Sequence, residues 1–136
     1  MAEQNKAIVR RFFEAFAAND QGTLRELFSP ALTFHHPSGP VNRDRHLQGI
    51  SLLTAAFSNI HVTVHDQIAE GDTVATRLTW RGVHSGNFQG HPATNNEFEV
   101  SAISIERISD GKIAERWFNQ DELGMLVQLG ILPPTG

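Results

Sequence analysis

The stretch from Asp110 to Asp121 carries residues that are well suited to acid–base chemistry. Its odd-numbered positions place Trp117, Asn119 and Asp121 at a spacing of two residues. Successive side chains of a strand point to opposite faces, so this spacing predicts that the three line one side of a strand that ends in a carboxylate. A carboxylate at the mouth of a pocket can act as a general base. Asp121 also directly precedes a helix-like run over residues 122–129, so it can equally be a helix N-cap, and the residues alone leave both roles open.

His84 is the second candidate for chemistry. It ends an alternating run over residues 73–84 in which it shares a predicted strand face with Trp80. A pocket histidine at this place could polarise a carbonyl group or share a proton with Asp121. The simpler alternative is a histidine at a strand end that bonds a loop carbonyl.

A short predicted strand around Phe34 carries two further histidines. Phe34 is expected to face the interior, so His36 shares its side by parity and His35 faces the other side. The chain has seven histidines but no helical His-x-x-x-His pair and no cysteine, and its histidine pairs sit on different strands. This arrangement predicts no metal site.

The helices and strands that position these residues can be predicted from the spacing of apolar residues, which changes along the chain. Apolar residues recur at helical spacing in the first part and alternate with polar residues after Asn59. The expected helices cover 3–18, 23–28 and 43–57, and the expected long strands cover 60–68, 73–84, 97–108 and 112–121. This order predicts an α+β fold in which a curved antiparallel sheet forms a cone over the N-terminal helices. A conical cavity between sheet and helices would be the ligand site, with Phe16 of the first helix in its wall.

Bulk composition narrows the functional classes. The chain has 136 residues, 40% of them hydrophobic and 19% charged, and a formal net charge of −4, which predicts one globular domain over residues 1–136. The basic residues are scattered, so we expect no nucleic-acid partner, and no apolar run is long enough for a membrane span. The first residues lack a signal pattern, so we expect a cytoplasmic protein.

The second half of the chain resembles the SnoaL-like polyketide cyclase (ester cyclase) family, within the nuclear-transport-factor-2-like superfamily of α+β barrels. The motifs that carry the resemblance are Trp80-Arg81-Gly82-Val83-His84-Ser85-Gly86-Asn87-Phe88-Gln89-Gly90, Asp110-Gly111-Lys112-Ile113, Glu115-x-Trp117-x-x-x-Asp121 and Gln128-Leu129-Gly130. The chain departs from the family pattern at two places. The usual Pro-Thr-Gly of the loop reads Ala93-Thr94-Asn95, and Arg116 stands where histidine is frequent.

The resemblance implies that Asp121 is the acid–base group of an intramolecular aldol closure of a polyketide ester, without cofactor or metal. It also favours a functional His84 and a homodimer formed through the sheets. A mixed apolar and charged outer sheet face, with Val83, Ile103, Ile105 and Phe118, agrees with such a dimer. That face is expected to carry solvated or subunit-facing stripes of Arg77, Arg81, Arg107 and Arg116 paired with Glu97, Glu99 and Glu106.

Two functions remain open from the sequence. The first is a cofactor-independent cyclase or isomerase acting on a small apolar carbonyl compound, with Asp121 and His84 catalytic. Its substrate would contact His36, Trp80, Trp117, Asn119 and Phe16. Because the chain has no tyrosine, the donor to a developing oxyanion would be Asn119, His84, His36 or water. The alternative is a non-catalytic module that uses the same cone to bind a small ligand or to dimerise, in which Asp121 only caps the last helix.

Overall fold

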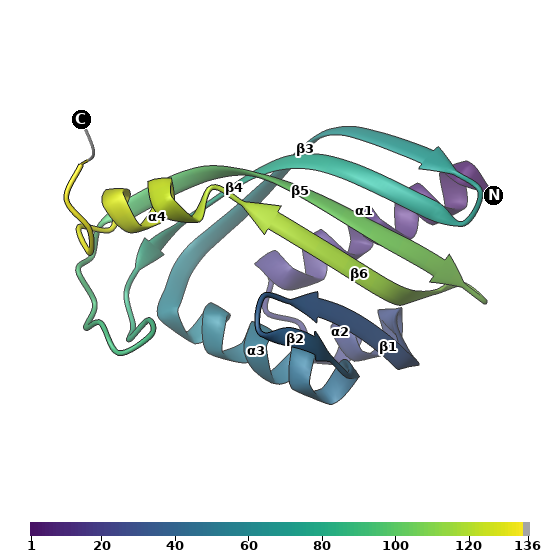
Figure 1. Cartoon of the computed structure of the whole chain (residues 1–136), viewed down its shortest axis with the longest axis horizontal. Coiled ribbons are helices and arrows are strands. Elements are labelled where there is room, and N and C mark those ends of the chain that lie inside the picture. The colour runs from purple at the N-terminus through teal and green to yellow at the C-terminus, as the bar shows by residue number, and fades with distance from the viewer. Residues whose placement is uncertain (135–136) are drawn as a thin grey trace.

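One open six-stranded sheet lies over three helices in the computed structural model, which describes residues 1–134 (Figure 1). The spatial order of the strands is β2-β1-β6-β5-β4-β3. The helices are α1 (Ala2–Ala17), α2 (Gln21–Leu27), α3 (Arg43–Ala56) and α4 (Glu122–Gln128). The strands are β1 (Phe28–His36), β2 (Gly39–Val41), β3 (Phe57–Glu70), β4 (Thr73–His84), β5 (Glu97–Ser109) and β6 (Lys112–Gln120). The α+β prediction is confirmed, with one correction: β1 pairs with β6 in parallel.

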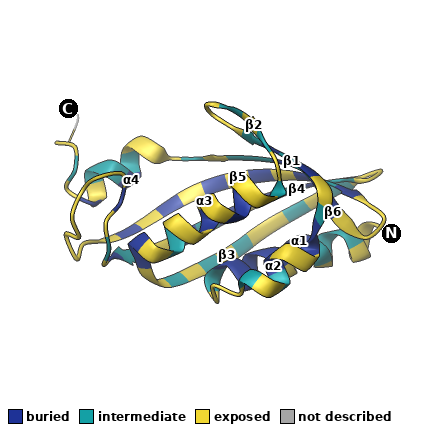
Figure 2. Ribbon diagram, turned by 90° about the horizontal axis from the view of Figure 1, so that it is seen from below, coloured by how far each residue is buried: buried dark blue, intermediate teal, exposed yellow. Residues whose placement is uncertain are grey.

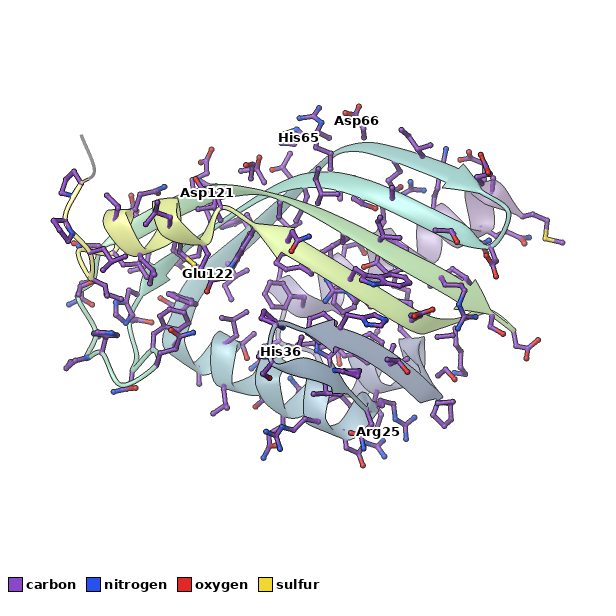
Figure 3. The ribbon with its side chains drawn as sticks, in the orientation of Figure 1. Arg25, His36, His65, Asp66, Asp121 and Glu122 are labelled. Atoms are coloured by element: carbon purple, nitrogen blue, oxygen red, sulfur yellow. The ribbon has the colours of Figure 1, made fainter. Side chains whose placement is uncertain are left out.

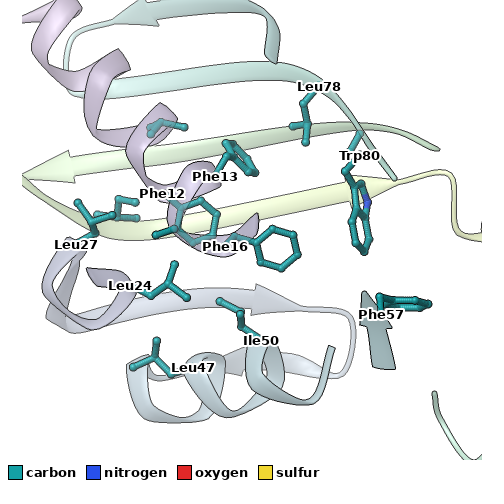
Figure 4. Close-up of a cluster of buried hydrophobic side chains, with 14 of the residues drawn as sticks. Phe12, Phe13, Phe16, Leu24, Leu27, Leu47, Ile50, Phe57, Leu78 and Trp80 are labelled. Carbon is teal, nitrogen blue, oxygen red and sulfur yellow. The ribbon is translucent and has the colours of Figure 1, made fainter. Parts of the chain in front are cut away.

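The helices α1 and α3 bury their apolar stripes against one face of the sheet (Figure 2). Helix α1 places Phe12, Phe13 and Phe16 at three- and four-residue spacing, which puts them on the same side of the helix. These rings meet side chains of the strands, and Phe16 lies edge-on to Trp80 with 5.6 Å between ring centroids (Figure 4). Aromatic packing therefore fills much of the space between helices and sheet.

Two irregularities change which side chains face the helices. In β6 the register with β5 shifts between Glu115 and Ile113, so that both Ile113 and Ala114 are buried. After this bulge the even-numbered residues of β6 face the interior, which reverses the predicted parity. A second shift in β3, between Val64 and Asp66, leaves Ile68 exposed on the outer face.

The turn between β5 and β6 is a two-residue hairpin loop. Ser109 pairs with Lys112, and the residues between them, Asp110 and Gly111, have φ angles of 52° and 75°. Positive φ at both central positions is the type I′ geometry that Asp-Gly favours. Asp110-Gly111 is therefore the sequence signal for this tight hairpin.

The outer face of the sheet carries exposed apolar side chains on β3 and β5, namely Ile68, Ile103 and Ile105. Among the described residues, no helix is both long enough and apolar enough to cross a membrane.

Candidate active site

Asp121 lies at the junction of β6 and α4, where its carboxylate caps the helix (Figure 3). Its Oδ1 accepts a hydrogen bond of 2.9 Å from the backbone N–H of Gly124. The side chain is exposed, and no other hydrogen bond to it is found within residues 1–134. A Cβ atom at position 124 would overlap the carboxylate, so glycine is needed there for this conformation. The predicted cap is therefore confirmed, and one carboxylate oxygen is left without a protein partner.

Trp117 and Asn119 do not lie beside the interior. Trp117 stacks on His35 on the outer face of the sheet, with ring centroids 4.6 Å apart, and Asn119 is exposed opposite Ile103. The bulge at Ala114 is the physical cause, because one additional residue moves every following side chain to the other face. Their prediction as pocket residues was wrong.

Strand β6 presents Arg116, Phe118 and Gln120 to the interior instead. Gln120 accepts a 2.8 Å hydrogen bond from the indole Nε1–H of Trp80 through its Oε1. Trp80 itself is buried and packs edge-on against Phe57 and Phe98, with centroids 6.0 and 4.8 Å away. The predicted inward position of Trp80 is therefore confirmed, and its polar edge has a partner that the sequence did not indicate.

His84 is fully buried at the end of β4, among the rings of Phe57 and Phe88. Its Nδ1 lies 3.0 Å from the hydroxyl of Thr94 and accepts a 3.3 Å hydrogen bond from the Thr94 backbone N–H. Its Nε2 is buried and has no hydrogen-bond partner in the described part of the chain. The predicted inward orientation of this histidine is confirmed.

The structure does not bring His84 and Asp121 together. The backbone N–H of Asp121 bonds Ser101, which pairs with Thr79 two strands away from β6. His84 lies five residues further along β4, which at the rise of an extended strand is about 17 Å. The two groups therefore do not share a proton directly.

His36 is exposed on the β1–β2 hairpin (Figure 3). Its Nδ1 lies 2.7 Å from the hydroxyl of Ser38 and accepts a bond from the Ser38 backbone N–H. It shares a side with Phe34, as parity predicted, with 6.3 Å between ring centroids. His36 is therefore at the rim of the inner face, whereas His35 bonds Glu115 on the outer face at 2.7 Å.

A buried charged cluster occupies the interior between β5, β6 and α3. Arg116 donates from Nε to Glu106 Oε2 at 2.8 Å, and the hydroxyl of Ser104 donates to Glu106 Oε1 at 3.0 Å. Removal from water raises the pKa of Glu106, opposed by the charge of Arg116 and the hydrogen bonds of its neighbours. Burial likewise lowers the pKa of Arg116, opposed by Glu106. The guanidinium carbon lies 4.4 Å from the ring centroid of Phe12, so the cation also rests on an aromatic face.

His46 on α3 completes this cluster. Its Nε2 lies 3.2 Å from Nη1 of Arg116, which can only donate, so Nε2 is the acceptor and the ring is neutral. Burial, and then the charges of Arg116 and His36, lower the pKa of His46 to about 2. The ring stacks on Phe34 at 3.8 Å.

The position of Arg116 and Glu106 corrects the sequence interpretation, which placed them in a solvated outer stripe. Both residues were expected among paired charges on the outer face, but they pair with each other inside the fold. The signal for Glu106 was present, because it shares parity in β5 with Phe98, Val100 and Ala102, all of which are buried. Arg116 could not be placed without knowledge of the β6 bulge, and no pattern in α3 marks His46.

Two hollows of the structure lie away from the space between sheet and helices, where the conical cavity was expected. A hollow of about 610 Å³ is lined by residues of the β2–α3 corner, including Pro40 and Arg45, and one of about 400 Å³ lies between α2 and α3. Within the described residues, no group of three or more histidine, aspartate or glutamate side chains is placed to hold a metal ion. The interior beside Trp80 and His84 is lined by aromatic rings.

Known protein sequences match this chain over most of its length. The model of the SnoaL-like polyketide cyclase family matches residues 7–129. The chain is 32% identical to aklanonic acid methyl ester cyclase DauD from Streptomyces sp. strain C5, over 94% of this chain and 83% of that protein. It is also 32% identical to aklanonic acid methyl ester cyclase DnrD from Streptomyces peucetius, over 94% of this chain and 92% of that protein.

A solved structure shows the same arrangement of elements. IdmH from Streptomyces antibioticus superimposes with a TM-score of 0.84 at 36% sequence identity, and the match covers 93% of this chain and 99% of that chain. The likeness therefore extends over nearly the whole length of both chains.

Proposed function

Since this chain belongs to the SnoaL-like polyketide cyclase family, we propose that it is a cofactor-independent cyclase that closes a ring in an apolar polyketide ester. The proposed reaction is an intramolecular aldol addition. The two curated relatives are named for their action on aklanonic acid methyl ester, and a compound of that class is the proposed substrate here.

The observation that carries this proposal is the state of the Asp121 carboxylate. The N-terminus of α4 holds Oδ1, and Oδ2 has no partner among the described residues. In the proposed reaction Oδ2 takes a proton from a carbon between two carbonyl groups, and the resulting enolate carbon forms a bond to a second carbonyl carbon of the same molecule. The proton then passes from Asp121 to the new alkoxide, so that the enzyme returns to its starting state. Holding the two reacting ends of one substrate close together lowers the activation free energy by about 7–11 kcal/mol in favourable cases.

The proposed binding surface uses Phe16, Trp80, His36 and His84, and leaves out Trp117 and Asn119. Phe16 and Trp80 form an aromatic wall, which suits a flat apolar substrate. His36 supplies a polar group at the rim. No cofactor enters the proposed reaction, because each proton that is removed is returned.

Asp121→Asn tests the proposal, with aklanonic acid methyl ester as the probe. Asparagine caps a helix about as well as aspartate, so α4 keeps its cap while the base is lost. We expect kcat to fall by at least a hundredfold, in keeping with loss of a general base. The neighbouring exposed acid gives the matched control, because Glu122→Gln removes the same charge and is expected to retain turnover. If Asp121→Asn turns over the ester at the wild-type rate, Asp121 is only a cap; if wild type binds the ester without turnover, the non-catalytic module is correct.

We also propose that the protein forms a homodimer through the outer face of its sheet and works in the cytoplasm. The exposed Ile103 and Ile105, beside the His35–Trp117 stack, support such an interface.

A further inference from the structure

The buried ring of His84 has one nitrogen with two partners and one with none. Nδ1 meets the hydroxyl and the backbone N–H of Thr94, while Nε2 is buried without a partner among residues 1–134. A buried polar group without a hydrogen bond costs about 1–3 kcal/mol, so native proteins rarely keep one without a use.

The direction of these bonds fixes where the proton of His84 lies. A backbone N–H can only donate, so Nδ1 must accept from Thr94. The Thr94 Oγ1 accepts a 3.3 Å bond from the backbone N–H of Asn96, and its own hydrogen is free to turn toward Nδ1 at 3.0 Å. Because Nδ1 accepts, the neutral ring carries its single proton on Nε2. The unpartnered atom is therefore a hydrogen-bond donor.

Thr94 is held in place by the ends of its loop. The backbone N–H of His84 bonds the carbonyl of Asn96, and that of Asn95 bonds the carbonyl of His84. Asn95 has a φ of 60°, a conformation that asparagine tolerates better than most residues other than glycine. Asparagine at position 95 is therefore compatible with the backbone geometry that holds Thr94 against His84.

We propose that the Nε2–H of His84 donates a hydrogen bond to a carbonyl oxygen of the substrate, and that Thr94 is the positioning residue that keeps this proton on Nε2. This assignment rests on the proposed function for the identity of the reaction. The surrounding rings are Phe57 and Phe88, with centroids 5.7 and 6.3 Å from the imidazole, so the group recognised is a carbonyl on an apolar, aromatic framework. Phe88 belongs to the loop over residues 85–96, the part of this wall that can yield most readily to a ligand.

The distance between His84 and Asp121 decides which carbonyl of the substrate His84 can hold. His84 lies about 17 Å along β4 from the residue that pairs beside Asp121, so one oxygen atom cannot meet both groups. The oxygen that Nε2–H holds therefore belongs to a carbonyl remote from the carbons that react at Asp121, and the bond orients the substrate. His84 keeps its proton throughout, so no covalent step passes through it.

Binding of two matched ligands tests the donor without any need for turnover. The first ligand is 2-acetonaphthone, an apolar aryl ketone, and the second is 2-ethylnaphthalene, which has the same shape without the oxygen. We expect His84→Phe to weaken binding of the ketone by about 3- to 10-fold, the range of one hydrogen bond, and to leave the hydrocarbon within about twofold. His84→Gln, which retains an N–H donor, is expected to recover part of the ketone affinity.

Nitrogen-15 NMR of the histidine side chains in the wild-type protein gives a second measurement. We expect Nε2 of His84 to be the protonated nitrogen, and its proton signal to move downfield with the ketone and not with the hydrocarbon. Thr94→Val removes the hydroxyl and keeps the longer bond from the backbone N–H, so it is expected to lower the share of the Nε2-protonated tautomer and to weaken ketone binding, whereas Thr94→Ser restores both. A merely structural role for Thr94 would change stability without changing the tautomer.

Failure of the His84 role and failure of the proposed function give different results. Ketone affinity is measured in Asp121→Asn as well, where we expect the wild-type value. Loss of catalysis with intact ketone discrimination would count against Asp121 or the reaction alone. Equal effects of His84→Phe on both ligands, failure of the wild-type protein to bind the ketone, or a proton on Nδ1 would each overturn the role of His84.

Discussion

Arg116 donates a 2.8 Å hydrogen bond to Glu106 inside the fold, where the arginine side chain is 6% exposed and the glutamate is 0% exposed. This pair joins the two central strands β5 and β6 on the face that the helices cover. Burial of two charges has a large desolvation cost, which attraction and additional hydrogen bonds must offset. The bond from Ser104 to Glu106 and the contact of Nη1 with His46 supply those bonds. The interior of this protein is therefore polar at its centre.

The first prediction concerns removal of one partner of this pair. Glu106→Gln leaves the buried Arg116 cation without its counter-ion, and we expect the free energy of unfolding to fall by about 3–5 kcal/mol. Replacement of both residues, as Glu106→Leu with Arg116→Met, is expected to cost less than either single change. Urea unfolding of the wild type, Glu106→Leu, Arg116→Met and the double replacement gives the double-mutant cycle, and Glu106→Gln is measured beside them.

An exposed pair gives the control for this cycle. Arg25 and Asp44 lie 3.0 Å apart with 55% and 74% of their side chains exposed, so Asp44→Asn is expected to change the free energy of unfolding by less than about 1 kcal/mol. If the double replacement of the buried pair costs as much as the two single changes added together, the two residues are not coupled.

Much of this fold follows from the sequence because periodicity reports which side of an element is buried. The helix over 43–57 and the strand over 73–84 lie close to where the patterns placed them. Parity in β4 correctly put Trp80 and His84 inside. In β6 the same argument failed, because the bulge at Ala114 depends on pairing with β5, which a single strand does not reveal.

Only part of the candidate site could be predicted from the sequence, for the same reason. Asp121 was identified from its place between strand and helix, and its cap was among the two roles considered. The cluster of His46 and Arg116 joins residues 70 positions apart, so only the packing of α3 beside β1, the strand paired with β6, brings them into contact. The tautomer of His84 likewise depends on the conformation of the loop that carries Thr94.

The second prediction concerns how the free energy of unfolding depends on pH through His46. Its pKa falls from the usual 6.5 to about 2 in the folded protein, because of burial and then the charge of Arg116. Between those pH values the unfolded chain binds a proton at this residue that the folded protein does not bind, so stability falls as pH falls. The slope approaches about 1.4 kcal/mol per pH unit for a single group.

His46→Gln tests this slope, because glutamine keeps an acceptor for Arg116 but does not titrate. Urea unfolding at pH 7, 6 and 5 is expected to show a shallower pH dependence in the variant than in the wild type. Glu106 acts in the opposite direction, because burial raises its pKa and its contribution falls as pH rises. It is present in both proteins, so the difference between them isolates His46; parallel pH curves would show that His46 does not stay neutral.

The third prediction concerns the outer face of the sheet. If this face forms the proposed dimer, Ile103→Lys places a charge in an apolar interface and raises the dimer dissociation constant by at least about tenfold, equivalent to 1.4 kcal/mol. Ile103 is 54% exposed in the single chain, so the substitution is expected to leave the monomer folded. Leu52→Lys is the matched control, because Leu52 is 69% exposed on α3, away from the sheet. Sedimentation equilibrium measures both, and equal dissociation constants for the two variants would place the interface elsewhere.

The last prediction uses two glycines in helices to test the position of Asp121. Replacement of a helical glycine by alanine normally stabilises a protein by about 1 kcal/mol. Gly49 in α3 has no atom within 4 Å of where its Cβ would lie, so Gly49→Ala is expected to show this gain. At Gly124 the new Cβ would overlap the Asp121 carboxylate and displace it from its cap, which costs about 1 kcal/mol and cancels the gain.

Displacement of the proposed base should also lower kcat/KM for aklanonic acid methyl ester by at least about tenfold, while Gly49→Ala leaves it unchanged. Thermal unfolding and turnover measured on the two variants separate these effects. A stabilised, fully active Gly124→Ala protein would mean that catalysis does not require the Asp121 carboxylate at the N-terminus of α4.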